Sequence, residues 1–334
     1  MSDPHLQSLI FPFQRSARFN GRILCIGLRE ASAELSRLSG DLTFIQGFRP
    51  DYLALESTGY RVLPEICNER FDAALIRLGR HRGQNEQWIS EAVQRLAPGS
   101  MVVIAGARTE GAASLRKRMA GLVAELQHAA MNHGEVFWFP MPADAEDLAR
   151  KIRPAPRPPI DGRFHTAPGM FSSDRIDPGS CLLAMNLPAD LAGEVADFCA
   201  GWGYLSAVVA DRFPAVRQLD LYEADFASLV AAKRNVTARE GLDIRFLWQD
   251  LAGEAVVARY DAIVSNPPFH VGRRSDPDLG RTILLRAASA LKRGGRLLLV
   301  ANRHLPYEQV LRDHFSGFRQ LAGQGGYKVL EARK

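Results

Sequence analysis

A side-chain amide, two prolines and an aromatic ring follow one another in residues 265–270, which read SNPPFH. The preceding residues 260–264, YDAIV, predict a buried β-strand. Because proline donates no backbone hydrogen bond and restricts its own φ angle, this strand must end in a stiff turn. Such a turn would present the Asn266 amide as a hydrogen-bonding group and the Phe269 ring as a stacking surface. The alternative is a plain structural turn, since Asn-Pro commonly begins one.

A glycine-rich loop precedes this turn in residues 195–206, which read VADFCAGWGYLS. The pattern predicts a strand that ends near Asp197, a loop, and a helix that begins near Tyr204. Gly201 and Gly203 allow the backbone to turn tightly and to approach a ligand closely, and the helix N-terminus offers unpaired N–H groups. G-x-G-x-x-S is only part of the dinucleotide-binding fingerprint, so a cofactor loop and an ordinary tight turn are both open readings.

Acidic residues end the next two predicted strands. The first, in residues 217–225, ends in Glu223, roughly 20 residues beyond the glycines, where a carboxylate suits a ribose diol or caps the next helix. The second, in residues 244–250, ends in Asp250, which can accept a hydrogen bond from an adenine amino group or belong to an ordinary loop. Ligands of open α/β sheets bind beyond the carboxyl ends of the strands, so we expect these side chains and Asn266 at one edge.

Both halves of the chain alternate strand-like and helix-like segments, which predicts an α/β fold with a doubly wound, mostly parallel sheet in each half. A proline-rich linker, residues 153–164, separates a first domain, residues 1–152, from a second, residues 165–334. The runs that begin at Phe71 and Tyr260 share an aromatic-Asp-Ala strand, a helix, a glycine turn and an apolar strand. This shared order indicates a duplication.

The two copies differ at the turn after this strand. Aligning them places residues 77–80, RLGR, opposite residues 266–269, NPPF. The early strand of the first copy, residues 21–28, is also not followed by a pair of closely spaced glycines. The first domain is therefore expected to have kept the fold and lost the chemistry.

The end of the chain predicts an antiparallel hairpin. Residues 318–334, FRQLAGQGGYKVLEARK, read as a strand, a turn at Gly325 and Gly326, and a second strand that closes the second sheet. A nicotinamide-dependent dehydrogenase needs no such hairpin and usually continues into a substrate domain. The hairpin therefore favours another class of cofactor for the glycine loop.

Composition sets broad limits on the class of protein. The 334 residues are 46% hydrophobic and 24% charged, which is typical of globular domains with sizeable cores. A formal net charge of +5 fits either an ordinary surface or attraction to an acidic partner such as RNA. The four cysteines form no C-x-x-C pair, so we expect neither a disulfide framework nor a metal site. We expect no signal peptide and no membrane span, and hence a cytoplasmic location.

With these features in place, the second half resembles the class I S-adenosylmethionine-dependent methyltransferases. Asn-Pro-Pro-Phe is the signature of members that methylate adenine N6, guanine N2 or the glutamine amide nitrogen. The whole chain is similar to the two-domain small-subunit ribosomal RNA guanine-N2 methyltransferases and to their large-subunit cousins. The segments that carry the resemblance are PGMFSSDRIDPGSCLL (168–183), DFCAGWG (197–203), NPPFHVG (266–272) and VANRHLPYEQVL (300–311).

The resemblance implies two tandem Rossmann-like methyltransferase domains, the first degenerate and serving RNA binding or structure. It implies S-adenosylmethionine as cofactor, ribosomal RNA or the small ribosomal subunit as partner, and a monomer. The implied cofactor-binding residues are Asp197, Ala200, Gly201, Gly203, Glu223, Ala224, Asp250, Asn266 and Phe171. Cys199 and Ala200 stand where the family usually has glycine and then cysteine, so we expect cofactor binding through an altered loop.

The same resemblance makes residues 266–269 the catalytic turn. The side-chain oxygen of Asn266 and the backbone carbonyl of Pro267 would accept the two hydrogens of an exocyclic amine and expose its lone pair. Pro268 would keep the turn stiff, and Phe269 would stack on the flipped base. Correct alignment of nitrogen, methyl carbon and sulfur can lower the barrier by up to roughly 7–11 kcal/mol. The expected RNA-binding side chains are His270, Arg273, Arg274, Arg77 and Arg80.

Two alternatives accompany a guanine-N2 activity on ribosomal RNA. The first keeps the reaction but changes the acceptor to adenine N6 or glutamine N5. The glutamine enzymes favour Tyr after the prolines, so Phe269 favours a base. The second is a non-catalytic, RNA-binding ribosome assembly factor, for which Cys199 in the glycine loop is the support.

Overall fold

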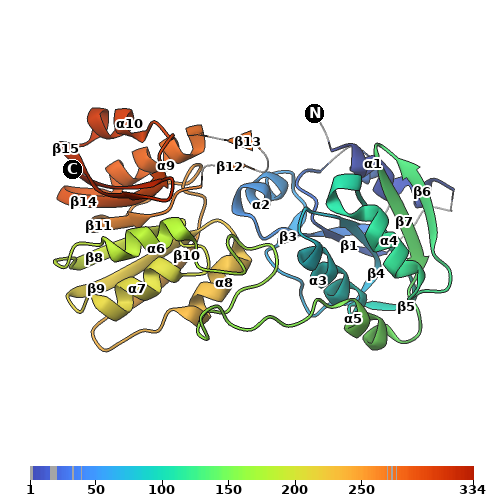
Figure 1. The fold of residues 1–334 in the computed structure, drawn as a ribbon. Helices are drawn as coiled ribbons and strands as arrows, with labels where there is room; N and C mark the ends of the chain where they lie inside the picture. The colour runs from blue at the N-terminus through green and yellow to red at the C-terminus, as the bar shows by residue number, and fades with distance from the viewer. Residues whose placement is uncertain are drawn as a thin grey trace. The chain divides into compact units, whose positions relative to one another are not determined.

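The computed structural model describes residues 3–15, 21–31, 34–38, 40–268, 270–271, 274–275 and 277–334. The chain divides into two compact units, Met1–Arg157 and Pro158–Lys334, coloured blue to green and green to red in Figure 1. The point of division lies inside the proline-rich segment, residues 153–164.

In the described residues the first unit is built on a seven-stranded sheet with the order β3-β2-β1-β4-β5-β7-β6. Neighbouring strands are parallel from β3 to β5, whereas β7 is antiparallel to both β5 and β6. The strands are β1 (Arg22–Ile26), β2 (Asp41–Ile45), β3 (Arg61–Leu63), β4 (Phe71–Arg77), β5 (Leu96–Ala107), β6 (Gln127–Met131) and β7 (Gly134–Pro140). The helices are α1 (Pro4–Ile10), α2 (Arg49–Glu56), α3 (Arg82–Val93), α4 (Ala112–Ala120) and α5 (Ala145–Ile152).

The second unit repeats this order as β10-β9-β8-β11-β14-β16-β15. Its described strands are β8 (Gly193–Phe198), β9 (Val216–Glu223), β10 (Asp243–Trp248), β11 (Tyr260–Ser265), β14 (Leu291–Asn302), β15 (Gly317–Gln324) and β16 (Tyr327–Arg333). Its helices are α6 (Pro178–Met185), α7 (Tyr204–Arg212), α8 (Phe226–Asn235), α9 (Pro277–Ala290) and α10 (Tyr307–His314). A two-stranded sheet pairs β12 (His270–Val271) with β13 (Arg274–Ser275).

The identical strand orders confirm the predicted pair of doubly wound, mostly parallel α/β sheets. The predicted hairpin around Gly325 and Gly326 is also confirmed, since β15 and β16 pair across it. A second hairpin, which the sequence did not predict, closes the first sheet and is formed by β6 and β7. Its turn contains Asn132 and His133, both at positive φ, and it carries no Asn-Gly signal in the sequence.

The second sheet is covered by helices on both faces, as the ribbon in Figure 1 shows. Successive residues of β14 alternate between two buried clusters: Leu298 packs with α6, α7 and α8, whereas Leu297 and Leu299 pack with α9 and α10. Strands buried on both faces read as continuous apolar runs, which is why no polar alternation marks them.

Among the described residues, no helix combines the length and apolar character needed to cross a bilayer.

Candidate active site

Parallel pairing brings the loops after β8, β9 and β11 to one edge of the second sheet. Ser265, the last residue of β11, lies beside Phe198, the last residue of β8, and Phe198 lies beside Tyr222 of β9. The Ser265 hydroxyl donates to the Phe198 carbonyl over 2.8 Å, which attaches the Asn-Pro-Pro turn to the start of the glycine loop. The neighbouring strand β10 ends at Trp248, two residues before the predicted end at Asp250.

The glycine loop is held by backbone hydrogen bonds to strand β9. The Ala200 amide donates to the Tyr222 carbonyl over 3.0 Å, and the Gly203 amide donates to the Ala200 carbonyl over 2.9 Å. Gly203 has φ +89°, and a Cβ there would lie 2.8 Å from the Val236 side chain, so glycine is required for close packing against the residue that follows α8. Gly201 has φ +56°, and a Cβ added there would have no described atom within 4 Å, apart from its neighbours in the chain. The loop therefore turns an open backbone face outward at Gly201.

Glu223, at the end of β9, joins the glycine loop to the loop that begins α8. One carboxylate oxygen accepts from the Gly201 amide over 2.7 Å, and the other accepts from the Asp225 amide over 2.8 Å. Burial raises the pKa of Glu223 to about 7, and these two backbone donors act in the opposite direction. Both carboxylate oxygens of Glu223 therefore hold backbone amides, and its role as an acceptor for ribose hydroxyls stays a prediction.

Asp197 is fully buried at the end of β8. One of its oxygens accepts from the Ser206 hydroxyl of α7 over 2.6 Å, while the other has no hydrogen-bond partner among the described residues. Burial raises the pKa of Asp197 to about 7. A buried acceptor without a partner is costly, and its presence beside the glycine loop is typical of a site that receives a polar or cationic ligand.

The other predicted cofactor residues have structural contacts of their own. Both carboxylate oxygens of Asp250 accept backbone hydrogen bonds within the loop after β10, from Ala252 over 2.9 Å and from Gly253 over 3.0 Å. Each oxygen keeps a second lone pair, so the adenine-binding role stays a prediction. The Ala224 carbonyl accepts from the Trp248 indole over 2.9 Å. The Phe171 ring is 57% exposed.

Trp202 packs into the core of the unit. Its ring is 4% exposed and lies 5.3 Å, between centroids, from the ring of Phe164. Its indole N–H donates to the Phe171 carbonyl over 2.9 Å, which ties the segment before α6 to the glycine loop. The bulky residue in the loop is therefore a structural contact.

Asn266 follows β11 with its amide nitrogen fixed on both sides. The nitrogen donates to the carboxylate of Asp177 over 3.0 Å and to the hydroxyl of Ser180 over 2.8 Å. Neither partner was identified as a site residue from the sequence, although Asp177-Pro178 is a typical helix start. Pro267 is buried and Pro268 half-buried, as expected for a rigid turn.

The predicted RNA-binding side chains of the second unit follow the Asn-Pro-Pro turn. Phe269 of the predicted catalytic turn and Arg273 lie outside the described residues, and for His270 and Arg274 only the backbone in β12 and β13 is described.

In the first unit the two predicted arginines differ. The Arg77 guanidinium is 12% exposed and pairs with Asp3 over 2.7 Å and with Glu110, so both carboxylates offset its charge. These contacts give Arg77 a structural role where the second unit has Asn266. Arg80 is exposed and forms no ion pair with any described residue.

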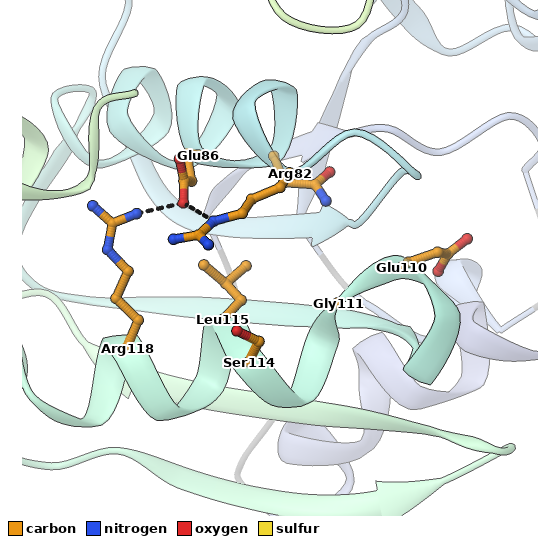
Figure 2. A pocket seen from close by; sticks show the side chains of 8 residues that line it. Arg82, Glu86, Glu110, Gly111, Ser114, Leu115 and Arg118 are labelled. Carbon is orange, nitrogen blue, oxygen red and sulfur yellow. Dashed lines mark hydrogen bonds and ion pairs between the residues drawn. The ribbon is translucent and has the colours of Figure 1, made fainter. Parts of the chain in front are cut away.

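A small cavity of about 50 Å³ lies beside α3 and α4 in the first unit. In Figure 2 the Arg82 and Arg118 side chains approach the buried carboxylate of Glu86 from two sides, and the Arg82 pair measures 2.7 Å. The described residues hold no cluster of metal-ligating side chains, here or elsewhere. The side chains of these two ion pairs line the cavity.

Comparison with known proteins finds methyltransferases for the second unit and for most of the chain. Residues 161–331 match the family model "Methyltransferase small domain". The chain is 33% identical over 269 residues to the ribosomal RNA small subunit methyltransferase C of Pseudomonas paraeruginosa, covering 79% of this chain and 80% of the relative. The Erwinia tasmaniensis protein of the same name is 38% identical over 172 residues, 51% of this chain and 48% of the relative.

A solved structure extends the likeness to both units. It is that of the T. thermophilus 16S rRNA N2 G1207 methyltransferase (RsmC) in complex with AdoMet and guanosine. It superposes with a TM-score of 0.78 at 25% identity and covers 99% of this chain and 92% of that chain. The first unit is therefore part of the shared architecture.

Cys199 offers a test of the altered loop, because it adopts φ +64°, a conformation that favours glycine. We expect Cys199→Gly to exceed Cys199→Ala in free energy of unfolding by about 0.5–1 kcal/mol. Relief of a steric cost of about 1–2 kcal/mol is partly offset by the greater chain entropy of glycine. Denaturant unfolding of both variants measures the difference. Ala200→Gly, at a neighbour outside the positive-φ region, is the control and should lose stability.

Proposed function

The chain belongs to the ribosomal RNA small subunit methyltransferase C family, and we propose that it transfers a methyl group from S-adenosylmethionine to the exocyclic N2 amine of a guanine in 16S ribosomal RNA. The observation that carries the proposal is Asn266, fixed by its amide nitrogen at the strand edge where Glu223 holds the glycine loop. The similarity to the T. thermophilus N2 methyltransferase, solved with guanosine, favours guanine N2 over adenine N6 and glutamine N5 as acceptor. The guanine equivalent to G1207 of the T. thermophilus enzyme is the expected target.

The residues at the strand edge suit S-adenosylmethionine in shape and charge. Gly201 presents open backbone, Asp197 a buried oxygen without a partner among the described residues, and Glu223 a carboxylate. We assign the ribose hydroxyls to Glu223, the adenine amino group to Asp250, and the remaining contacts to Ala200, Gly203, Ala224 and Phe171. When bound, the cofactor supplies an electrophilic methyl group on a sulfonium.

The protein's own task is to prepare the guanine amine. The lone pair of this amine is delocalised into the base, so the amine is a poor nucleophile. The Asn266 oxygen and the Pro267 carbonyl accept its two hydrogens, which fixes the nitrogen and favours a pyramidal geometry. The prolines keep the carbonyl in place, Phe269 stacks on the base, and the proton leaves to solvent after transfer.

The first unit supports this reaction as an RNA-binding domain. It keeps the strand order of the second unit but has Arg77, paired with two carboxylates, where the catalytic turn would be. Arg80, exposed three residues further on, is the side chain to which we assign contact with phosphate. We propose that the protein acts as a monomer in the cytoplasm on the RNA or the small subunit.

Asn266→Ala should reduce methyl transfer at least 1,000-fold, because one of two acceptors for the amine is lost. The dissociation constant for S-adenosylmethionine should change less than threefold. Radiolabelled methyl transfer to 16S ribosomal RNA measures the first effect, and calorimetry measures the second. Residual activity near wild type would remove Asn266 from the mechanism, whereas loss of cofactor binding would indicate a folding defect.

Cofactor affinity should rise about tenfold from pH 6 to pH 8 if one carboxylate must ionise, and about 100-fold if both must. Asp197 and Glu223 both have pKa values raised by burial to about 7, and a sulfonium cation binds the ionised carboxylates more strongly. Binding should therefore release protons near neutral pH, which calorimetry in buffers of different ionisation enthalpy detects. Glu223→Gln should weaken binding and flatten the pH profile. An equally steep profile in this variant would exclude Glu223 as the titrating group.

Arg80→Glu should weaken binding of 16S ribosomal RNA about three- to tenfold and reduce the slope of its salt dependence by about 1. Arg150→Glu is the matched control, since Arg150 is also an exposed arginine of the first unit but lies on α5, beside the linker. Fluorescence anisotropy across a salt series measures both variants. Equal affinities for the two would place the RNA on another surface.

A further inference from the structure

A side-chain amide can offer either its oxygen or its nitrogen to a ligand, and only one choice works here. The oxygen accepts hydrogen bonds, whereas the NH₂ group only donates them. An Asn266 amide turned with its nitrogen toward the guanine amine would place donor against donor. Some feature of the protein must therefore select the productive orientation.

Asp177 and Ser180 provide that selection. A carboxylate is an acceptor only, so the end of Asn266 that lies 3.0 Å from the Asp177 oxygen must be the nitrogen. The Ser180 hydroxyl accepts from the same nitrogen over 2.8 Å. Both hydrogens of the amide are thereby engaged, and the oxygen is directed to the opposite side.

The carboxylate of Asp177 is itself held in place. Asp177 is the N-cap of α6, and the oxygen that binds Asn266 also accepts the Ser180 backbone amide over 2.8 Å. Asp177 and Ser180 are each 8% exposed. A Cβ at Gly179 would lie 2.9 Å from the Tyr327 ring and 3.0 Å from the Asp177 oxygen, so the first turn of α6 packs tightly against β16. This leaves the carboxylate little freedom to release the amide.

We propose that Asp177 and Ser180 are positioning residues that orient the Asn266 amide with its oxygen toward the acceptor amine. The inference rests on the proposed function, because it assigns the side chains that make that turn productive. The negative charge of Asp177 also polarises the amide and makes its oxygen a stronger acceptor. Neither residue touches the base or exchanges a proton.

The competing role for Asp177 is that of a helix cap alone, and two substitutions separate the roles. Asp177→Ser keeps an N-cap residue of high preference but is too short to reach Asn266. Ser180→Ala removes the hydroxyl contact and keeps the backbone amide that the cap binds. Asp144→Ser is the matched control, since Asp144 caps α5 in the first unit through the same type of bond, to Asp147 over 2.8 Å.

We expect kcat for 16S ribosomal RNA to fall about 10- to 100-fold in Asp177→Ser and about tenfold in Ser180→Ala. The KM for RNA, the calorimetric affinity for S-adenosylmethionine and the Tm should stay close to wild type in both. Ser180→Thr, which restores a hydroxyl, should recover most of the activity lost in Ser180→Ala. Asp144→Ser should retain full kcat.

Each outcome bears on a stated claim. An unchanged kcat in Asp177→Ser would overturn the positioning role while leaving the proposed function intact. A loss of kcat accompanied by an equal loss of Tm and cofactor affinity would also overturn it, in favour of the helix cap. A wild-type protein that transfers no methyl group to guanine would overturn the proposed function, and the positioning role with it.

Discussion

The parallel pairing of β8 with β11 is the interaction on which the site depends. It sets Ser265 beside Phe198, and the hydrogen bond from the Ser265 hydroxyl to the Phe198 carbonyl joins the Asn-Pro-Pro turn to the glycine loop. A shift of one residue in this register would turn each side chain of β11 to the other face and carry Asn266 away from the glycine loop. The apolar residues of the strands, buried on both faces, oppose such a shift because every one of them would leave its cluster.

The two units share one architecture and differ at the ends of the equivalent strands β4 and β11. Both units keep the same strand order and a closing hairpin. In the first unit β4 ends in an arginine, Arg77, which is salt-bridged to two carboxylate partners and lies at the position that corresponds to Asn266 of the second unit. A buried charge needs such partners, and they tie α1 and the end of β5 to the centre of the sheet.

Local sequence patterns were sufficient for the strands, the glycine loop and the second hairpin, because apolar runs and glycine positions specify them directly. The hairpin between β6 and β7 was not predicted, because its two turn residues, Asn132 and His133, include no glycine of the kind that usually marks such turns. The hydrogen-bond partners of the site side chains could not be predicted because they are distant in the sequence. Asp177 lies 89 positions before Asn266, and Asp3 lies 74 positions before Arg77. Such contacts follow from the packing of whole elements, and no periodicity in one segment encodes them.

The thiol in the glycine loop has a further chemical consequence. Burial and the nearby carboxylates of Glu223, Asp197 and Asp250 all raise the pKa of Cys199 well above that of an ordinary cysteine. Oxidants and alkylating agents attack the thiolate, and at neutral pH almost none is present here. Burial, with the nearby carboxylates adding to its effect, therefore protects this thiol from oxidation, so a cysteine can occupy a glycine position without becoming a reactive one.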